Sequence, residues 1–216
     1  MKNIKILIVS ATELEISFFK KELKKNNNNS VEILITGIGG IFTTYFLTKI
    51  LSKEKYDIII NLGIAGSFDE NLKIGEVVEV VEDEFADLGI ENKEKFFTLF
   101  DMKFIDKNSF PFKNGKIINK NNFFKNLNLK KVKAITVNKA SGNLKNIKKI
   151  KGKFSPQIET MEGAFFFFVC KMENQKCLQL RSISNLVEER NKKNWNIHKA
   201  VKNLNKILEN LIIKNS

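Results

Sequence analysis

Short apolar runs alternate with helix-like segments along the first third of the chain. The runs at 5–9, 31–35 and 56–61 are mostly apolar over the length of a strand, which is typical of strands covered on both faces. Between them, the spacing of apolar residues predicts one helix with Glu15 in its first turn and another helix over 41–51. This alternation predicts a largely parallel β-sheet with helical connections.

The pattern is less regular in the rest of the chain, but it still predicts several elements. Small residues over 62–67 indicate a loop after the third strand, and 83–91 fits a loop or a short strand. Residues 92–131 are rich in Lys, Asn and Phe and indicate only two turns, at Pro111 and at Asn114-Gly115. The other predicted elements are a strand or hairpin over 73–81, strands over 133–137 and 176–183, a buried helix over 161–172, and an amphipathic helix from Trp195 onward.

Together these elements predict a single domain over residues 1–216. We expect a three-layer α/β/α fold whose central sheet is mixed but mostly parallel. In such sheets, ligands bind beyond the carboxyl ends of the strands. The segments expected at that edge are 11–15, 37–40, 63–67, 138–142 and Ser184-Asn185, with Met161-Glu162 at the start of the buried helix.

The charge balance changes this picture little. The net charge of +13 would suit a nucleic-acid partner, but arginine, the residue favoured for bidentate contacts with phosphates and bases, occurs only at Arg181 and Arg190. The lysines are spread along the whole chain among many asparagines, which is typical of a solvated surface. We therefore expect no nucleic-acid partner.

Cysteine and histidine usage also excludes several classes of site. Cys170, Cys177 and His198 are too few and too scattered for a structural zinc site, so we expect no metal and no disulfide. No run approaches the roughly 18 apolar residues of a membrane span, and residues 4–9 lack the features of a signal peptide. The sequence predicts a cytoplasmic protein with no membrane partner.

Two segments carry candidate chemistry. Glu162 stands beside the apolar run at 164–170, and a buried carboxylate needs a cation, hydrogen-bond donors or a ligand with hydroxyl groups. A helix N-terminus that favours Glu explains it equally well. The glycine-rich segment at 36–40 matches a dinucleotide fingerprint only incompletely, and we expect no bound cofactor.

Four motifs, in this order, resemble the nucleoside phosphorylase and nucleosidase superfamily over nearly the whole chain except residues 92–131. They are Ala-Thr-x-x-Glu ending at Glu15, Thr-Gly-Ile-Gly at 36–39, Asn-Leu-Gly-Ile-Ala-Gly at 61–66 with Lys-Ile-Gly-Glu-Val at 73–77, and Met-Glu-Gly-Ala at 161–164. Within the superfamily the chain looks most like the futalosine hydrolases. The segments that carry this likeness are 84–89, 136–138, 181–185, Glu188, Arg190-Asn191, 195–197 and Ala200.

The resemblance implies a small-molecule nucleoside substrate and hydrolysis of its N-glycosidic bond, with futalosine as the substrate. Glu162 matches the glutamate that binds the ribose hydroxyls, and Met161 would lie against the sugar, although plain core packing is a strong alternative for Met161. Glu15 matches the glutamate that orients the attacking water, although it could simply stabilise a first helical turn. Phosphorylases usually hold phosphate here with arginine, and neither arginine of this chain falls in these early loops, so we favour water as the nucleophile.

Asn185 differs from the residue that the resemblance implies at this position. Adenine-specific members of the superfamily have an aspartate there. An amide can donate one hydrogen bond and accept another, which suits a 6-oxopurine such as hypoxanthine. The alternative is that Asn185 only caps a turn.

The remaining expected contacts are less specific. The loops that contain Ile64, Gly66 and Asn138 would meet the base, and Arg190 and Trp195 suit an aromatic carboxylate at the far end of the substrate. One enzyme alternative stays open, a methylthioadenosine/S-adenosylhomocysteine nucleosidase. Two alternatives of other classes are a nucleoside-binding protein without catalysis and, as the weakest, a nucleic-acid binder. The family commonly pairs subunits, so we expect a homodimer.

Overall fold

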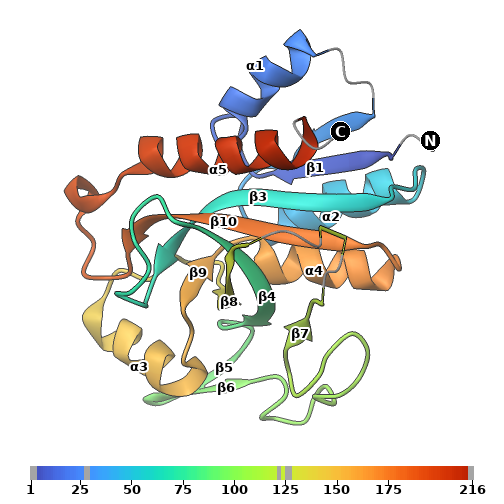
Figure 1. Cartoon of the computed structure of the whole chain (residues 1–216). Coiled ribbons are helices and arrows are strands. Elements are labelled where there is room, and N and C mark those ends of the chain that lie inside the picture. Colours follow the sequence, from blue (N-terminus) through green and yellow to red (C-terminus); the bar gives the residue numbers. More distant parts are fainter. Residues whose placement is uncertain (1–3, 27–29, 121–122, 125–127, 214–216) are drawn as a thin grey trace.

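A computed structural model describes residues 4–26, 30–120, 123–124 and 128–213 (Figure 1). The strands are β1 (Ile6–Ser10), β2 (Val31–Ile35), β3 (Ile58–Ser67), β4 (Val77–Phe85), β5 (Gly89–Asn92), β6 (Lys95–Thr98), β7 (Ile117–Ile118), β8 (Lys130–Thr136), β9 (Ile158–Thr160) and β10 (Cys177–Leu186). The helices are α1 (Ser17–Lys25), α2 (Gly40–Leu51), α3 (Leu144–Phe154), α4 (Gly163–Met172) and α5 (Ile197–Ile212). The fold is therefore mixed α/β, as expected.

The central sheet is mixed and closes partly on itself. Its strand order is β10-β4-β8-β9-β3-β1-β2, and β10 pairs with β3 as well as with β4. The pairings of β1 with β2 and β3, of β3 with β10, and of β8 with β4 and β9 are parallel. The pairings of β4 with β10 and β7 and of β3 with β9 are antiparallel. Because β10 returns to β3, the carboxyl ends of β1, β3 and β10 lie side by side.

Helices cover both faces of the sheet, because the side chains of each strand point alternately to opposite faces. On β1, Leu7 and Val9 belong to the apolar core that also contains residues of α2 and α4. Their neighbours Ile6 and Ile8 belong to a second core with residues of α1 and α5. Figure 1 shows these two helix pairs on opposite sides of β1 and β3. The predicted arrangement of three layers is therefore confirmed.

Two strands are longer than the sequence predicts. The small residues over 62–67 form the end of β3 rather than a loop, because β10 pairs with them as far as Ser67. Ser184-Asn185 likewise lies within β10, at a point where the pairing register shifts. Ladder hydrogen bonds from a neighbouring strand thus override the turn-like composition of both segments.

Several boundaries also differ from the prediction. Helix α1 begins at Ser17, so Glu15 lies in the turn before the helix and not in its first turn. β4 starts at Val77, four residues later than the strand or hairpin predicted from residue 73. The turns at Pro111 and Asn114-Gly115 are confirmed. The polar turn expected after α1, over 24–30, lies partly outside the described residues.

Helix α3, strand β9 and the small β5–β6 sheet were not predicted from the sequence. Helix α3 is largely polar and buries only Ile147 among its residues, so its apolar spacing is weak. Its start is nevertheless well defined, since the Asn143 side chain accepts hydrogen bonds from the N–H groups of Lys145 and Asn146. Strand β9 is only three residues long and leads directly into Met161-Glu162.

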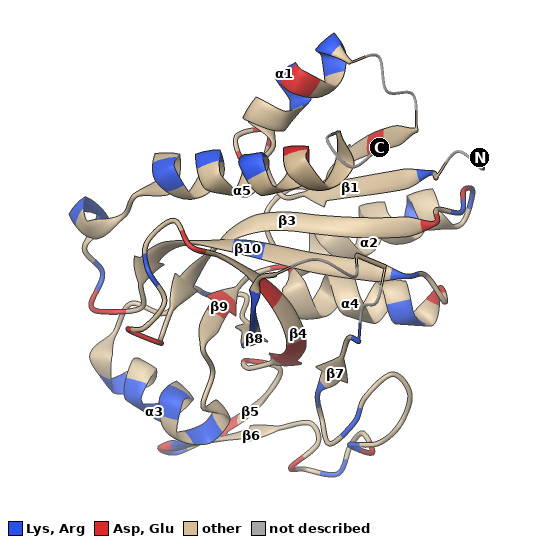
Figure 2. Ribbon diagram, in the orientation of Figure 1, with Lys and Arg blue, Asp and Glu red and all other residues tan. Residues whose placement is uncertain are grey.

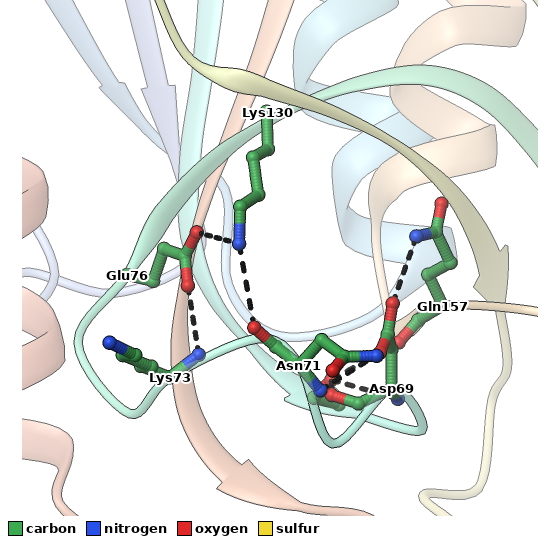
Figure 3. Close-up of polar contacts among 7 residues, drawn as sticks. Asp69, Asn71, Lys73, Glu76, Lys130 and Gln157 are labelled. Carbon is green, nitrogen blue, oxygen red and sulfur yellow. Dashed lines mark hydrogen bonds and ion pairs between the residues drawn. The ribbon is translucent and has the colours of Figure 1, made fainter.

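A polar network fixes the connection between β3 and β4 (Figure 3). Gln157, just before β9, donates from Nε2 to Asp69 Oδ2 at 3.1 Å, and Asp69 Oδ1 accepts from the Asn71 N–H at 2.9 Å. Farther along, Lys130 Nζ lies 2.8 Å from Glu76 Oε1. The network ties the β3–β4 connection to β8 and to the segment before β9, on the side of the sheet that carries the predicted site.

Charged residues are distributed over many elements. Figure 2 shows Lys and Arg on α1, α3, α5 and several loops, with Asp and Glu among them. None of the helices in the described part of the chain combines the length and the apolarity needed to cross a bilayer.

Candidate functional site

A cavity of about 320 Å³ opens at the carboxyl ends of β1, β3 and β10. The predicted site residues that line it are Glu15, Ile64, Gly66, Met161, Glu162, Asn185, Arg190 and Trp195. Asn138 is absent from this lining. The segments that sequence reasoning placed at one edge of the sheet therefore do meet there, with the single exception of Asn138.

Glu15 is held by four hydrogen bonds at the bottom of the cavity. Its Oε2 accepts from Ser10 Oγ at 3.3 Å, from the Thr12 N–H at 3.1 Å and from Thr12 Oγ1 at 3.0 Å. Its Oε1 accepts from the Ile64 N–H at 3.1 Å. The residue is only 8% exposed, so its carboxylate has one defined position. These four bonds hold both carboxyl oxygens in place, so Glu15 can act as a fixed hydrogen-bond acceptor.

Glu162 occupies the N-cap position of α4, and it reaches across the cavity mouth to a second helix. Its Oε1 accepts from the N–H of Gly39 at 2.8 Å, and Gly39 is itself the N-cap of α2. Two helix N-termini thus converge on one carboxylate, which favours its negative charge. Burial nevertheless raises the pKa of Glu162, an effect opposed by the positive charge of Arg181 and by the Gly39 hydrogen bond.

Arg181 is the functional residue that sequence reasoning missed. It is 1% exposed and lies under the cavity, where it donates from Nη2 to Asn61 Oδ1 and from Nη1 to the Leu180 carbonyl. A Cβ atom added to Gly63 would lie 3.2 Å from both Arg181 Nη1 and Glu15 Oε1, so the two groups flank that glycine. Burial lowers the pKa of Arg181, and the charges of Glu162 and Glu15 oppose this effect.

One available signal could have pointed to Arg181. It is a cation within 176–183, a predicted core strand, and a buried charge must be paired. In the structure, the charges that act on Arg181 are those of the two predicted site glutamates and of Asp83. Two carboxylates above one guanidinium form a charged centre that can accept hydrogen bonds from hydroxyl groups, orient a water, and stabilise a developing positive charge.

Asn185 also lines the cavity, beside Gly66. Its Oδ1 accepts from Ser184 Oγ at 2.7 Å, and its Nδ2 donates to the Leu186 carbonyl at 2.8 Å. A Cβ atom on Gly66 would be 3.3 Å from Asn185 Nδ2. The local bond to Leu186 uses one of the two amide hydrogens, which leaves the second available to a ligand.

Asn138 is placed differently from the expectation. Its N–H and its Nδ2 donate to Asp87, at 2.6 and 3.0 Å, outside the cavity lining. The next residues of that loop do reach the cavity, and Glu159 holds them: its carboxylate accepts from the Ser141 N–H at 2.8 Å and from Ser141 Oγ at 2.5 Å. Burial raises the pKa of Glu159, which lines the cavity and was not predicted as a site residue.

Arg190 and Trp195 form the outer wall of the cavity. The guanidinium carbon of Arg190 lies 5.5 Å from the centroid of the Trp195 ring, within the range of a cation–π contact. A larger cavity, of about 990 Å³, adjoins this wall between α3 and the β5–β6 sheet and shares Ala140, Ser141 and Arg190 with the smaller one. The larger volume does not mark the chemistry, since Glu15 and Glu162 line only the smaller cavity.

Within the described ranges, His, Cys, Asp and Glu side chains do not gather into a group that could hold a metal ion. The chemistry available at the site is that of the two carboxylates, Arg181 and Asn185.

Comparisons with known proteins agree with this geometry. A family model described as the Phosphorylase superfamily matches residues 8–213. A futalosine hydrolase of Thermus thermophilus is 25% identical over 225 aligned positions, which cover 95% of this chain and 94% of that protein. A 5'-methylthioadenosine/S-adenosylhomocysteine nucleosidase of an Exiguobacterium strain is 30% identical over 101 residues. That alignment covers 40% of this chain and spans only 43% of the relative.

Solved structures show the same fold. The structure of a Helicobacter pylori futalosine hydrolase superposes with a TM-score of 0.79 at 18% identity and covers 98% of both chains. A mutant of the H. pylori methylthioadenosine/S-adenosylhomocysteine nucleosidase, with 5'-methylthioadenosine in its active site, superposes with a TM-score of 0.77 at 19% identity. That alignment covers 98% of this chain and 99% of the other.

Proposed function

The chain belongs to the phosphorylase superfamily, and we propose that it is a purine nucleosidase that hydrolyses the N-glycosidic bond of futalosine. The products are hypoxanthine and dehypoxanthine futalosine, which places the reaction in menaquinone biosynthesis. The observation that carries the proposal is the convergence of Glu15 and Glu162 on one cavity, above Arg181 and opposite Asn185. The nearly full-length likeness to a futalosine hydrolase supports the choice of substrate.

The sugar binds at the charged end of the cavity. Hydrolysis of an N-glycosidic bond passes through a state with positive charge on the sugar ring, and an enzyme accelerates it by binding that state more tightly than the substrate. Glu162 accepts from the vicinal ribose hydroxyls and stabilises the growing charge. Met161, which lines the same cavity, lies against the sugar face.

Water attacks from the side of Glu15. The carboxylate is fixed by Ser10, Thr12 and Ile64, so it can orient a water and take up its proton. Arg181 requires a correction to the argument from sequence, because a cation does lie near this position. Its guanidinium is bonded to Asn61 and Leu180 beneath the carboxylates, however, and Glu15 would repel a phosphate ion.

The purine binds between Asn185, Gly66 and the loop held by Glu159. The free amide hydrogen of Asn185 suits N7 or O6 of hypoxanthine, both of which are acceptors. Ile64 contributes its backbone, and the Arg190–Trp195 pair suits the aromatic carboxylate of futalosine.

A second candidate activity is cleavage of methylthioadenosine or S-adenosylhomocysteine. The partial alignment with nucleosidases of that specificity favours it, and the amide of Asn185, which cannot protonate a purine nitrogen as an acid would, argues against it. A nucleoside-binding protein without catalysis is the alternative of another class. The defined positions of both glutamates argue against that reading.

We also propose a cytoplasmic homodimer. Helix α2 and the residue before its N-cap expose large apolar side chains beside the cavity mouth: Ile38, Ile41, Phe42 and Tyr45, which are 58%, 79%, 52% and 58% exposed. An exposed apolar patch of this kind is typical of an interface between subunits.

The test of the function is a substrate comparison in phosphate-free buffer. Futalosine, aminodeoxyfutalosine, methylthioadenosine and inosine are incubated separately with the protein, and the free base is quantified by chromatography. We expect hypoxanthine from futalosine. Release of adenine from methylthioadenosine instead would establish the second candidate, and binding without release of any base would establish the non-catalytic reading.

A further inference from the structure

A buried polar cluster lies directly behind the turn that carries Glu162. It consists of Asp83 on β4, Thr136 on β8, Thr160 on β9 and Gln179 on β10, one side chain from each of four strands. All four residues are buried, with exposures between 0 and 3%. Buried polar groups are costly unless they are hydrogen-bonded, so the cluster calls for an explanation beyond packing.

The hydrogen bonds of the cluster run from the start of α4 to Asp83. The N–H of Gly163 donates to Thr160 Oγ1 at 3.2 Å, and the N–H of Ala164 donates to Thr136 Oγ1 at 2.8 Å. The two hydroxyls lie 3.1 Å apart, and Thr136 Oγ1 donates to Asp83 Oδ1 at 2.9 Å. Since Thr160 accepts from Gly163, its own hydrogen is free to point to Thr136. Asp83 is thus the common acceptor at the end of both chains.

Gly163 is in close contact with the same cluster. A Cβ atom there would lie 2.2 Å from Asp83 Oδ2, 2.3 Å from Gln179 Oε1 and 2.8 Å from Thr160 Oγ1. The first residue of α4 is therefore in direct contact with the carboxylate, at a distance that only glycine permits. Asp83 and Gln179 set how closely the helix start approaches the sheet.

Gln179 allows the cluster to accommodate a neutral side chain at position 83. Its Nε2 donates to Asp83 Oδ2 at 3.3 Å, while its Oε1 is buried and has no hydrogen-bond partner among the described residues. If the amide of Gln179 turns over, Oε1 can accept from a donor on residue 83. Burial raises the pKa of Asp83 to about 7, with Thr136, Gln179 and the charge of Arg181 opposing the rise.

We propose that Asp83 is a positioning residue of the site, which through Thr136 and Thr160 fixes the start of α4 and thereby the Glu162 carboxylate. The proposal rests on the proposed role of Glu162 in binding the sugar. Asp83 does not line the cavity; its hydrogen bonds reach Glu162 through the turn between Thr160 and Gly163, and its charge also acts on Arg181. Errors of about 1 Å in the placement of a reacting group cost about 10²-fold in rate, so such a support is functionally important.

Two pairs of variants separate the hydrogen bonds from the packing. Asp83→Leu removes the acceptor at nearly constant size, and Asp83→Asn keeps one acceptor and offers a donor to Gln179 Oε1. Thr136→Val removes the hydroxyl that links Ala164 to Asp83, and Thr136→Ser keeps it. Glu82→Gln is the matched control, because Glu82 is the next residue on the same strand and pairs with Lys116 outside the site.

Two measurements are made on each variant that folds, as judged by circular dichroism. The first is kcat and KM with the nucleoside that the wild-type protein cleaves. The second is amide hydrogen exchange over residues 160–168, which needs no substrate. We expect Asp83→Leu and Thr136→Val to lower kcat/KM by about 10- to 10²-fold and to speed exchange in this segment. Asp83→Asn, Thr136→Ser and Glu82→Gln should stay within about threefold of the wild type, by the same reasoning.

The two measurements distinguish the possible failures. Unchanged exchange and unchanged kcat/KM in Asp83→Leu and Thr136→Val would overturn the proposal, and so would faster exchange without loss of activity. Equal losses in Asp83→Asn and Asp83→Leu would also overturn it, since they would show that the charge and not the hydrogen bond is required. If the wild-type protein cleaves no nucleoside, the proposed function fails, and hydrogen exchange alone decides whether Asp83 holds the start of α4.

Discussion

The two ends of the cavity are built on different principles. At the sugar end, the carboxyl groups of Glu15 and Glu162 accept hydrogen bonds from three parts of the chain, the segment 10–12, Gly39 and Ile64, and both act electrostatically on the buried Arg181. At the base end, Asn185 is neutral and forms side-chain hydrogen bonds with the residues on either side of it, Ser184 and Leu186. The first end combines local hydrogen bonds with long-range ones from Gly39 and Ile64, whereas the hydrogen bonds of Asn185 are all local.

This difference suggests separate functions for the two ends of the site. A developing positive charge requires carboxylates whose positions do not change during the reaction, and these need many partners to hold them in a buried place. A base is discriminated by a donor or an acceptor that can be exchanged by a single substitution. We therefore expect rate to depend on the sugar end and substrate choice on the base end.

The strongest test of this division is Glu15→Gln. The amide keeps the size of the side chain and can still accept from Ile64, but it cannot take up a proton. We expect kcat to fall by about 10³-fold, within the range that general base catalysis contributes. KM should change little, since Glu15 acts on the water. A fall of less than about tenfold would show that Glu15 does not orient the nucleophile.

Glu162→Gln should have the next largest effect. Removing the negative charge next to the sugar is expected to lower kcat/KM by about 10²-fold, the scale of losing one electrostatic contact to the transition state. Because burial raises the pKa of Glu162, the wild-type acid limb should also lie above the ordinary range of glutamate. A pH profile of kcat/KM measures this limb; the activity must decrease as the pH falls and Glu162 becomes protonated.

Asn185→Asp probes the base end. A carboxyl group in place of the amide removes a donor to a 6-oxopurine and offers an acid to an adenine nitrogen. We expect the ratio of futalosine to methylthioadenosine cleavage to fall by about tenfold or more, which corresponds to about 1.4 kcal/mol. The wild-type protein and Ser184→Ala, which keeps the amide, are assayed beside it. Equal ratios in all three proteins would contradict a role of Asn185 in substrate choice.

The smallest expected effect concerns the pH dependence of protein stability due to Asp83, which lies behind the turn that carries Glu162. Asp83 titrates at about 7 in the folded protein and at the ordinary value of 3.8 when unfolded, so the folded state holds its proton more strongly. The stability due to this group is complete below about pH 4 and is lost as the pH rises through 7. The Asn side chain does not titrate, so Asp83→Asn keeps its stability as the pH rises. The Tm of this variant minus the Tm of the wild type should therefore increase by at least about 2 °C between pH 5 and pH 8. Scanning calorimetry at both pH values measures it, and a constant difference would refute the titration.

The sequence predicted the sugar end better than the base end. Glu15 and Glu162 were both expected at the start of a helix at the carboxyl edge of the sheet, where parallel strands bring such positions together. Arg181 was missed because its closeness to Glu15 depends on β10 lying beside β3, a pairing between segments far apart that no local pattern reveals. The turn at Glu15 was predicted as helix because its apolar neighbours Leu14 and Ile16 continue the helical spacing.

The base end depends on features that have weak sequence signals. Asn138 follows a predicted strand, as a contact should, but Asp87 from another connection binds it instead. The neighbouring loop is held by hydrogen bonds from Ser141 to Glu159. Glu159 lies on β9, a strand too short to be recognised from its composition. The roles of the predicted residues in the reaction stay predictions until the substrate comparison is made.

The hydrogen bond from Gly39 to Glu162 links the reaction centre to the surface. Gly39 is the N-cap of α2, a helix with several exposed apolar side chains. The Glu162 carboxylate is therefore bonded to the start of α2 and, in the proposed function, also to the sugar. Ligand hydroxyls and the Gly39 N–H compete for the same oxygens. By thermodynamic reciprocity, any subunit that shifts α2 on docking changes the affinity for the ligand, and the ligand changes the affinity for that subunit by the same factor. For the proposed homodimer, subunit assembly and substrate binding would then be coupled.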